Sequence, residues 1–243
     1  MMKAVFFDVD YTLIHPGPTF GGDGYRAFAA RHGLRADPRR FAAAVSDATA
    51  ELDFARNTVY RPDPFIRYAA RVLRGMGAAG PEARLESCAR EIYDEWGHPH
   101  HFALYDDVLA TLGALHRAGY RIGLISNTHR CLATFQRHFA LDPFVTAAVS
   151  SYEHGRLKPD PSIFRAALAE VGVAAGDGVM VGDSVPHDID GARQVGMGAV
   201  LIARTGESPA TPGAGVPVVR TLTELPAVLP RLASEADPDR TGG

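Results

Sequence analysis

The alternation of short apolar runs with helix-like segments is the feature that most restricts the fold of this chain. From Tyr105 onward, apolar runs predict strands at 121–125, 145–149, 179–181 and 199–202, and helical patterns fill 107–118, 130–139, 161–171 and 188–195. Strands that alternate with helices form βαβ units, in which the strands are parallel and helices cover both faces of the sheet. The pattern therefore predicts an α/β fold.

The beginning of the chain is expected to supply one more strand of this sheet. Ala4-Val5-Phe6-Phe7 is a continuous apolar run, as expected for a strand buried on both faces. Between about Gly22 and Gly97 the pattern is helical, with no convincing strand and with helices predicted at 24–34, 38–55, 63–77 and 81–97. We expect a Rossmann-like core with an inserted all-helical domain.

The expected boundaries follow from this division. Residues 1–16 and 103–233 form the α/β core, residues 17–102 form the helical insertion, and residues 234–243 form a flexible tail. Val216–Val219 is a candidate edge strand. Leu222–Leu232 is a candidate closing helix, although Pro226 and Pro230 weaken that prediction.

Composition excludes several classes of partner. Hydrophobic residues make up 46% of the 243-residue chain and charged residues 22%, which is ordinary for a globular protein. The formal charge of -3 offers no basic field for nucleic acid or an anionic membrane, and no apolar stretch approaches the roughly 20 residues that span a bilayer. Asp8 comes too early for a secretory signal, so we expect a cytoplasmic protein.

Polar residues follow the predicted strands at the point where each strand ends. Those residues are Asp8, Asp10 and Thr12 after the first strand, Ser126 and Asn127, Lys158, and Asp183 with Ser184. Ligands of open α/β sheets bind beyond the carboxyl ends of the strands, so we expect these side chains to converge. Lys158 is also one of only two lysines among 25 basic side chains, which favours a specific role for its charge.

This set of side chains suits a hard cation and a phosphoryl group. Carboxylates and hydroxyls are ligands for Mg²⁺, and no Cys or His joins the cluster to favour a softer metal. Taken alone, Asp8-Val9-Asp10 is more often a turn or a helix cap than a catalytic pair, and Asp188 could simply cap the following helix. The further motifs after the other strands reverse that expectation.

Together these motifs resemble the haloacid dehalogenase (HAD) superfamily. The matching residues are Asp8-Val9-Asp10-Tyr11-Thr12, Ser126-Asn127, Lys158-Pro159 and Gly182-Asp183-Ser184 with Asp188, in the family's order and spacing. The helical insertion after the first motif looks like the family's helical cap of the first-insertion type (C1, subfamily IA). The segment Pro16–Leu34 is similar to the branch that contains the HDHD-like and REG-2-like phosphatases. Tyr11 departs from the small residue common at its position.

The resemblance implies a magnesium-dependent phosphatase that acts on a small phosphomonoester. Asp8 would be the nucleophile that forms an aspartyl-phosphate, and Asp10 the general acid and base. The metal ligands would be Asp8, the backbone carbonyl of Asp10, Asp183 and Asp188, with Asp188 as a ligand or an anchor. The phosphoryl oxygens would be bound by Thr12, Ser126, the Asn127 amide and Lys158.

Several alternatives stay open. A 2-haloacid dehalogenase of this fold lacks the second acid, so Asp10 disfavours it, whereas a sugar phosphomutase shares every core motif. A regulatory or binding protein that has lost turnover is the alternative from a different class. His98, His100 and His101 flank Pro99 and are expected to be surface or hinge histidines. The sequence does not distinguish a monomer from a homodimer, nor does it identify the substrate.

Overall fold

The computed structural model describes residues 2–54, 57–204 and 213–235, and the chain divides into two compact units. The first unit comprises residues 1–15, 57–59 and 104–243, and the second comprises residues 16–56 and 60–103. The short segment 57–59, which the sequence pattern placed within the helical insertion, belongs to the first unit. The predicted tail at 234–243 lies mostly outside the described residues.

The first unit contains a six-stranded parallel sheet with the strand order β5-β4-β1-β6-β7-β8. The strands are β1 (Ala4–Phe7), β4 (Arg121–Ser126), β5 (Val145–Ser150), β6 (Gly178–Gly182), β7 (Gly198–Ile202) and β8 (Val218–Val219). All four residues of β1 are buried, as expected for the central strand of a sheet that is covered on both faces. The predicted α/β fold with a parallel sheet is confirmed.

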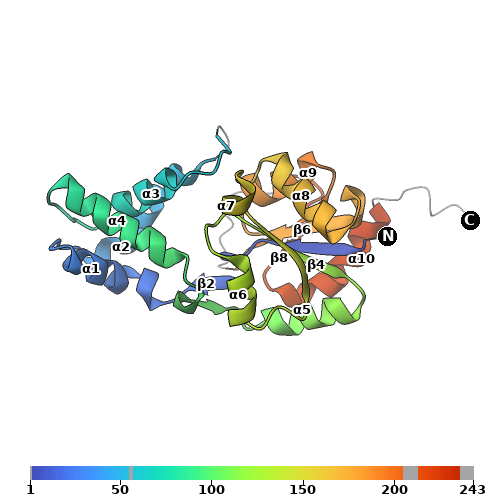
Figure 1. Cartoon of the computed structure of the whole chain (residues 1–243). Coiled ribbons are helices and arrows are strands. Elements are labelled where there is room, and N and C mark those ends of the chain that lie inside the picture. The colour runs from blue at the N-terminus through green and yellow to red at the C-terminus, as the bar shows by residue number, and fades with distance from the viewer. Residues whose placement is uncertain (1, 55–56, 205–212, 236–243) are drawn as a thin grey trace, which may run out of the picture. The chain divides into compact units, whose positions relative to one another are not determined.

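Helices cover both faces of this sheet (Figure 1). The helices of the first unit are α5 (Val108–Arg117), α6 (Leu132–His138), α7 (Ser151–His154), α8 (Pro161–Val171), α9 (Asp190–Gln194) and α10 (Leu225–Glu235). Helices α8 and α9 lie on one face, while α5 and α10 lie on the other. A core cluster that includes Phe6, Phe164, Leu168 and Met180 fills the space between α8 and the sheet.

The register of the central strands determines where the site forms. Phe7, the last residue of β1, pairs with Leu124 of β4 and with Val181 of β6. The chain continues from β4 to β5 on one side of β1, and then crosses to β6 and β7 on the other side. The carboxyl end of β1 is therefore the switch point at which ligands of such sheets bind.

In its described residues the second unit contains four α-helices: α1 (Gly22–Arg31), α2 (Phe41–Ala48), α3 (Asp63–Gly75) and α4 (Glu82–Trp96). Helix α3 buries Ile66, Ala69, Val72 and Leu73, a spacing that forms one helical face, and it packs against both α2 and α4. An aromatic cluster forms around Phe20, whose ring centroid lies 4.5 Å from that of Trp96.

Some elements differ from the prediction. The helix expected at 38–55 is shorter, because 3-10 turns at Pro38–Arg40 and Thr49–Leu52 flank α2. Strands β2 (Ile14–Pro16) and β3 (Phe102–Leu104) were not predicted, and they pair as a separate two-stranded sheet. Among the described residues, no helix is long and apolar enough to cross a membrane.

The closing helix forms in spite of its two prolines. A capping box at Thr221 and Glu224 starts a 3-10 turn that leads into α10. Pro226 lies in the first turn of α10, where the missing N–H has no helical partner to lose, and Pro230 lies inside the helix. Leu222, Leu225 and Leu229 are fully buried, so packing of this apolar face adds to the capping and stabilises the helix against its prolines.

Candidate active site

A buried ammonium joins two of the predicted acids. Lys158 Nζ donates hydrogen bonds to Asp8 Oδ1 at 2.6 Å, to Asp188 Oδ1 at 2.6 Å and to the carbonyl of Ile125 at 2.8 Å. Asp8, Lys158 and Asp188 are each at most 7% exposed, so little water screens their charges. All three donors of the ammonium are used, and this fixes its position beside Asp8.

The side chain of Asn127 holds the Lys158 loop in place. Its Oδ1 accepts the backbone N–H of Lys158 at 2.7 Å, and its Nδ2 donates to the Lys158 carbonyl at 3.1 Å. These two bonds tie the end of β4 to a loop that is 31 residues away in the sequence. The Asn127 side chain therefore positions Lys158. The binding of a phosphoryl oxygen by its backbone amide stays a prediction.

A tight turn after β6 brings Asp188 to the same place. Residues Val185–Ile189 form one π-helical turn, and the backbone N–H of Ser184 donates to Asp188 Oδ2 at 3.0 Å. A Cβ atom on Gly182 would lie 2.3 Å from Asp188 Cγ. The glycine is therefore required for this close approach of Asp188 to the end of β6.

Asp8, Asp183 and Asp188 form a group that fits a hard divalent cation. One carboxylate oxygen from each lies within 4.8 Å of the others. Burial raises the pKa of Asp8 to about 7, although the Lys158 ammonium acts in the opposite direction. Burial, followed by the charges of Asp8 and Asp188, also raises the pKa of Asp183 well above its ordinary value.

Burial is the main cause of both raised pKa values, and an excess of negative charge adds to it. Lys158 contributes one positive charge to three clustered carboxylates, so the ionised forms of the acids repel one another in a poorly solvated place. A divalent cation with oxygen ligands would supply the missing positive charge, and carboxylates are the ligands that Mg²⁺ binds in proteins. The donor set therefore fits magnesium.

Asp10 has a partner that the sequence analysis missed. Arg130 Nη2 donates to Asp10 Oδ1 at 3.1 Å, and Arg130 Nη1 donates to Asp10 Oδ2 at 3.3 Å, so the pair is bidentate. The Arg130 side chain is fully buried. The sequence pattern placed Arg130 at the start of a helix at 130–139, but α6 begins only at Leu132. The signal that could have indicated it is an arginine three residues after the Ser126-Asn127 motif.

Two hydroxyls of the predicted set are buried. Within the described part of the chain, Thr12 Oγ1 and Ser126 Oγ have no hydrogen-bond partner. Buried hydroxyls are almost always hydrogen bonded, so two such groups at the ends of β1 and β4 indicate a place where a polar ligand completes the structure. The Thr12 carbonyl accepts a hydrogen bond at 2.7 Å from Arg204, a second arginine that the sequence analysis missed.

Tyr11 follows Asp10 in the first motif and precedes the buried Thr12. Its φ angle is 61°, in the left-handed region that non-glycine residues rarely adopt, and its side chain is exposed. The backbone N–H of Tyr11 donates to the Ile14 carbonyl at 2.7 Å, which closes the turn after β1. Strained backbone of this kind clusters at functional sites.

Comparisons with known proteins agree with this architecture. The model of the haloacid dehalogenase-like hydrolase family matches residues 2–196. The glyceraldehyde 3-phosphate phosphatase of Methanopyrus kandleri is 32% identical over 220 residues, which cover 84% of this chain and 85% of the relative. Haloacid dehalogenase-like hydrolase domain-containing protein 3 of Mus musculus is 26% identical over 245 residues, which cover 95% and 94% of the two chains.

A solved structure shares the fold along nearly the whole chain. The crystal structure of a HAD phosphatase from Thermococcus onnurineus has a TM-score of 0.63 and 26% sequence identity, and the match covers 94% of this chain and 98% of that one. The predicted resemblance is thus confirmed by sequence and by fold. The chain belongs to the haloacid dehalogenase-like hydrolase family.

Proposed function

We propose that this protein is a magnesium-dependent phosphatase that hydrolyses a small phosphomonoester through an aspartyl-phosphate on Asp8. The observation that carries the proposal is the placement of Asp8 at the end of β1, in contact with the Lys158 ammonium and grouped with Asp183 and Asp188. The similarity to a phosphatase along most of the chain supports the same reaction class.

In the first step, a carboxylate oxygen of Asp8 attacks phosphorus while the bond between phosphorus and the ester oxygen breaks. Asp10 donates a proton to the departing oxygen, so the product leaves as an alcohol. In the second step, Asp10 removes a proton from water, the resulting oxygen attacks phosphorus, and the bond to Asp8 breaks. Inorganic phosphate and the original Asp8 carboxylate are released.

Positive charge and hydrogen-bond donors stabilise the phosphoryl group during both steps. We assign this role to Lys158, the hydroxyls of Thr12 and Ser126, and the Asn127 amide, because charge on the transferring oxygens must be balanced by fixed donors. Mg²⁺, held by Asp8, Asp183 and the Asp10 carbonyl with Asp188 as a ligand or anchor, would neutralise further charge there.

Asp10 distinguishes this reaction from dehalogenation. A dehalogenase of this fold needs no acid to protonate its leaving group, whereas an ester oxygen does. The bidentate contact with Arg130 holds the Asp10 carboxylate in one orientation, which a general acid requires. A phosphomutase would use the same residues, and the products decide between it and a hydrolase.

We further propose that the helical second unit, residues 16–56 and 60–103, acts as the cap that selects the substrate. The triose phosphate named for the relative from Methanopyrus kandleri is a first compound to test. A panel of metabolite monophosphates with magnesium would rank the candidates by kcat/KM.

The decisive experiment compares the wild type with Asp8→Asn and Asp10→Asn variants. We expect phosphate release by the wild type with Mg²⁺, none by Asp8→Asn, and a turnover that is slower by roughly 10² to 10⁴ in Asp10→Asn. Acid-quenched protein should carry phosphate on Asp8. Turnover in Asp8→Asn equal to that of the wild type would exclude the covalent mechanism, and transfer of phosphate between two sugar positions would identify a mutase.

A further inference from the structure

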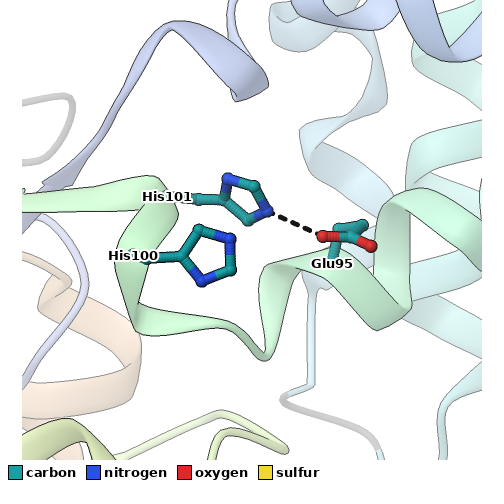
Figure 2. A group of neighbouring side chains, drawn as sticks. All are labelled: Glu95, His100 and His101. Carbon is teal, nitrogen blue, oxygen red and sulfur yellow. Dashed lines mark hydrogen bonds and ion pairs between the residues drawn. The ribbon is translucent and has the colours of Figure 1, made fainter. Parts of the chain in front are cut away.

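The end of helix α4 and the turn that follows it bring a carboxylate and two imidazoles together. Glu95 lies in the last turn of α4, while His100 and His101 lie in the 3-10 turn Pro99–His101. One possible ligand atom from each residue lies within 4.8 Å of the other two. Figure 2 shows both imidazoles directed toward the Glu95 side chain. All three residues belong to the second unit, and none takes part in the proposed phosphatase reaction.

The spacing is close to that of a metal site. Ligand atoms at about 2.0 to 2.1 Å from a tetrahedral zinc ion are separated by about 3.3 Å. In the structure, His101 Nε2 and Glu95 Oε2 lie 2.7 Å apart in a hydrogen bond, and the rings of His100 and His101 have centroids 4.0 Å apart. The three candidate ligand atoms all lie within 4.8 Å of one another, so side-chain rotations would place them around one ion.

The charges around Glu95 favour a cation. Glu91, which lies on α4 like Glu95, also pairs with a histidine, because it accepts from His32 at the end of α1 at 2.6 Å. Glu91 differs in that it also pairs with the guanidinium of Arg31. The ion pairs of Glu95 among the described residues involve only His101. Glu95 is therefore paired with an imidazole and not with a permanently charged guanidinium. When the imidazoles are neutral, no positive charge balances the negative charge of the Glu95 carboxylate.

Solvent reaches the group. His100 is exposed, and the side chains of Glu95 and His101 keep 35% and 16% of their exposure. The segment is short and constrained by Pro99, and the His101 ring packs edge-on against Phe20 at 5.5 Å between centroids. The ligands are therefore partly fixed before any ion binds, which lowers the cost of ordering them.

We propose that Glu95, His100 and His101 form a binding site for one divalent transition-metal ion of the zinc class. Two imidazoles and one carboxylate match the protein ligands of open zinc sites, in which water fills the remaining position. Imidazole nitrogen also distinguishes this site from the all-oxygen group at Asp8, which suits magnesium. The bound ion would join the end of α4 to the segment that enters β3, next to the point where the chain leaves the second unit.

The test uses the full-length protein without a polyhistidine tag. Zinc binding is measured by calorimetry in excess magnesium, and Co²⁺ replaces zinc to give an absorption spectrum that reports the ligand geometry. We expect the wild type to bind one zinc ion, and we expect His100→Ala to lower the zinc affinity by at least roughly tenfold. Loss of a residue that only hydrogen-bonds to a metal ligand typically has an effect of that size. Glu95→Gln should weaken binding similarly.

Two controls assign the signal. His32→Ala removes a histidine that pairs with Glu91, another glutamate of α4, and we expect this variant to retain the zinc affinity of the wild type. Asp183→Asn removes a ligand of the core group, and we expect zinc binding at the second unit to remain. Because His100 is exposed, its replacement leaves the core of the unit intact even if His101→Ala unfolds.

Three results would overturn the proposal: no zinc binding to the wild type, equal affinity in His100→Ala, or an equal loss in His32→Ala. Each of these measurements reports metal binding without turnover. The outcome is therefore independent of whether Asp8 is the nucleophile of a phosphatase.

Discussion

The ion pair between Arg130 and Asp10 leads to a quantitative prediction about stability and catalysis. Arg130→Met replaces the guanidinium with an apolar side chain of similar length, and it leaves the Asp10 carboxylate in place. The Arg130 side chain is 0% exposed and that of Asp10 is 19% exposed, so solvent replaces little of the lost interaction. The variant should therefore leave a carboxylate that is partly buried and poorly compensated.

The expected loss of stability follows from the burial of the pair. Removing one partner of a buried ion pair costs roughly 3 to 5 kcal/mol, and the partial exposure of Asp10 places this case at about 3 kcal/mol. In a chain of this size, 1 kcal/mol shifts the melting temperature by roughly 2 to 4 °C. We expect Arg130→Met to melt roughly 6 to 12 °C below the wild type.

A double-mutant cycle isolates the interaction between the two side chains. Melting and urea unfolding are measured for Arg130→Met, Asp10→Asn and the double variant, and the coupling energy should be roughly 1 to 3 kcal/mol. Arg67→Met is the matched control, because Arg67 pairs with Glu51 on the surface with 59% of its side chain exposed. Such exposed pairs contribute about 0 to 1 kcal/mol, so this variant should melt close to the wild type.

Kinetics test whether the pair also orients Asp10. If the bidentate contact sets the direction of the carboxylate, Arg130→Met should lower kcat by roughly 10- to 100-fold. This loss is smaller than the full effect of removing a general acid, which is roughly 10²- to 10⁴-fold. Arg130→Lys, which restores the charge without the fork of two donors, should recover only part of the loss. Additive effects in the cycle, together with an unchanged kcat, would refute a coupled pair and its positioning role.

Two further predictions concern the acids around Lys158. The raised pKa of Asp8, about 7 against an ordinary 3.8, means that the folded state holds a proton that the unfolded chain has released across this range. Without magnesium, the free energy of unfolding should fall as pH rises from about 4 to about 7. The gain in melting temperature on adding Mg²⁺ should be larger at about pH 8 than at about pH 5.5. A gain that is independent of pH would contradict this reasoning. Gly182→Ala would place a Cβ atom 2.3 Å from Asp188 Cγ, whereas Gly176 has nothing within 4 Å of such an atom. We expect Gly182→Ala to lower the free energy of unfolding by roughly 1 to 3 kcal/mol and to remove most of the phosphatase activity. Gly176→Ala is the control and should stay close to the wild type in urea unfolding and phosphate release. Equal behaviour of the two variants would show that Asp188 needs no close approach to β6.

The sequence by itself determined the sheet and the edge at which the polar residues gather. Apolar runs alternating with helices allow few architectures, and parallel strands place all their carboxyl ends on one side. For this reason Asp8, Asp183 and Lys158 could be assigned to one site without coordinates. The local pattern also predicted most of the helices, although it did not resolve the π-helical turn at Val185–Ile189 that positions Asp188.

The tertiary structure alone decided which side chains touch. Arg130 and Asp10 are 120 residues apart in the sequence, and Lys158 and Asp8 are 150 residues apart. No local preference encodes such contacts, because they depend on the packing of elements that are remote along the chain. The group at Glu95, His100 and His101 is the opposite case, since its members are close in sequence. There the turn Pro99–His101 after α4 places the imidazoles beside the carboxylate, and a tertiary contact with Phe20 supports the His101 ring.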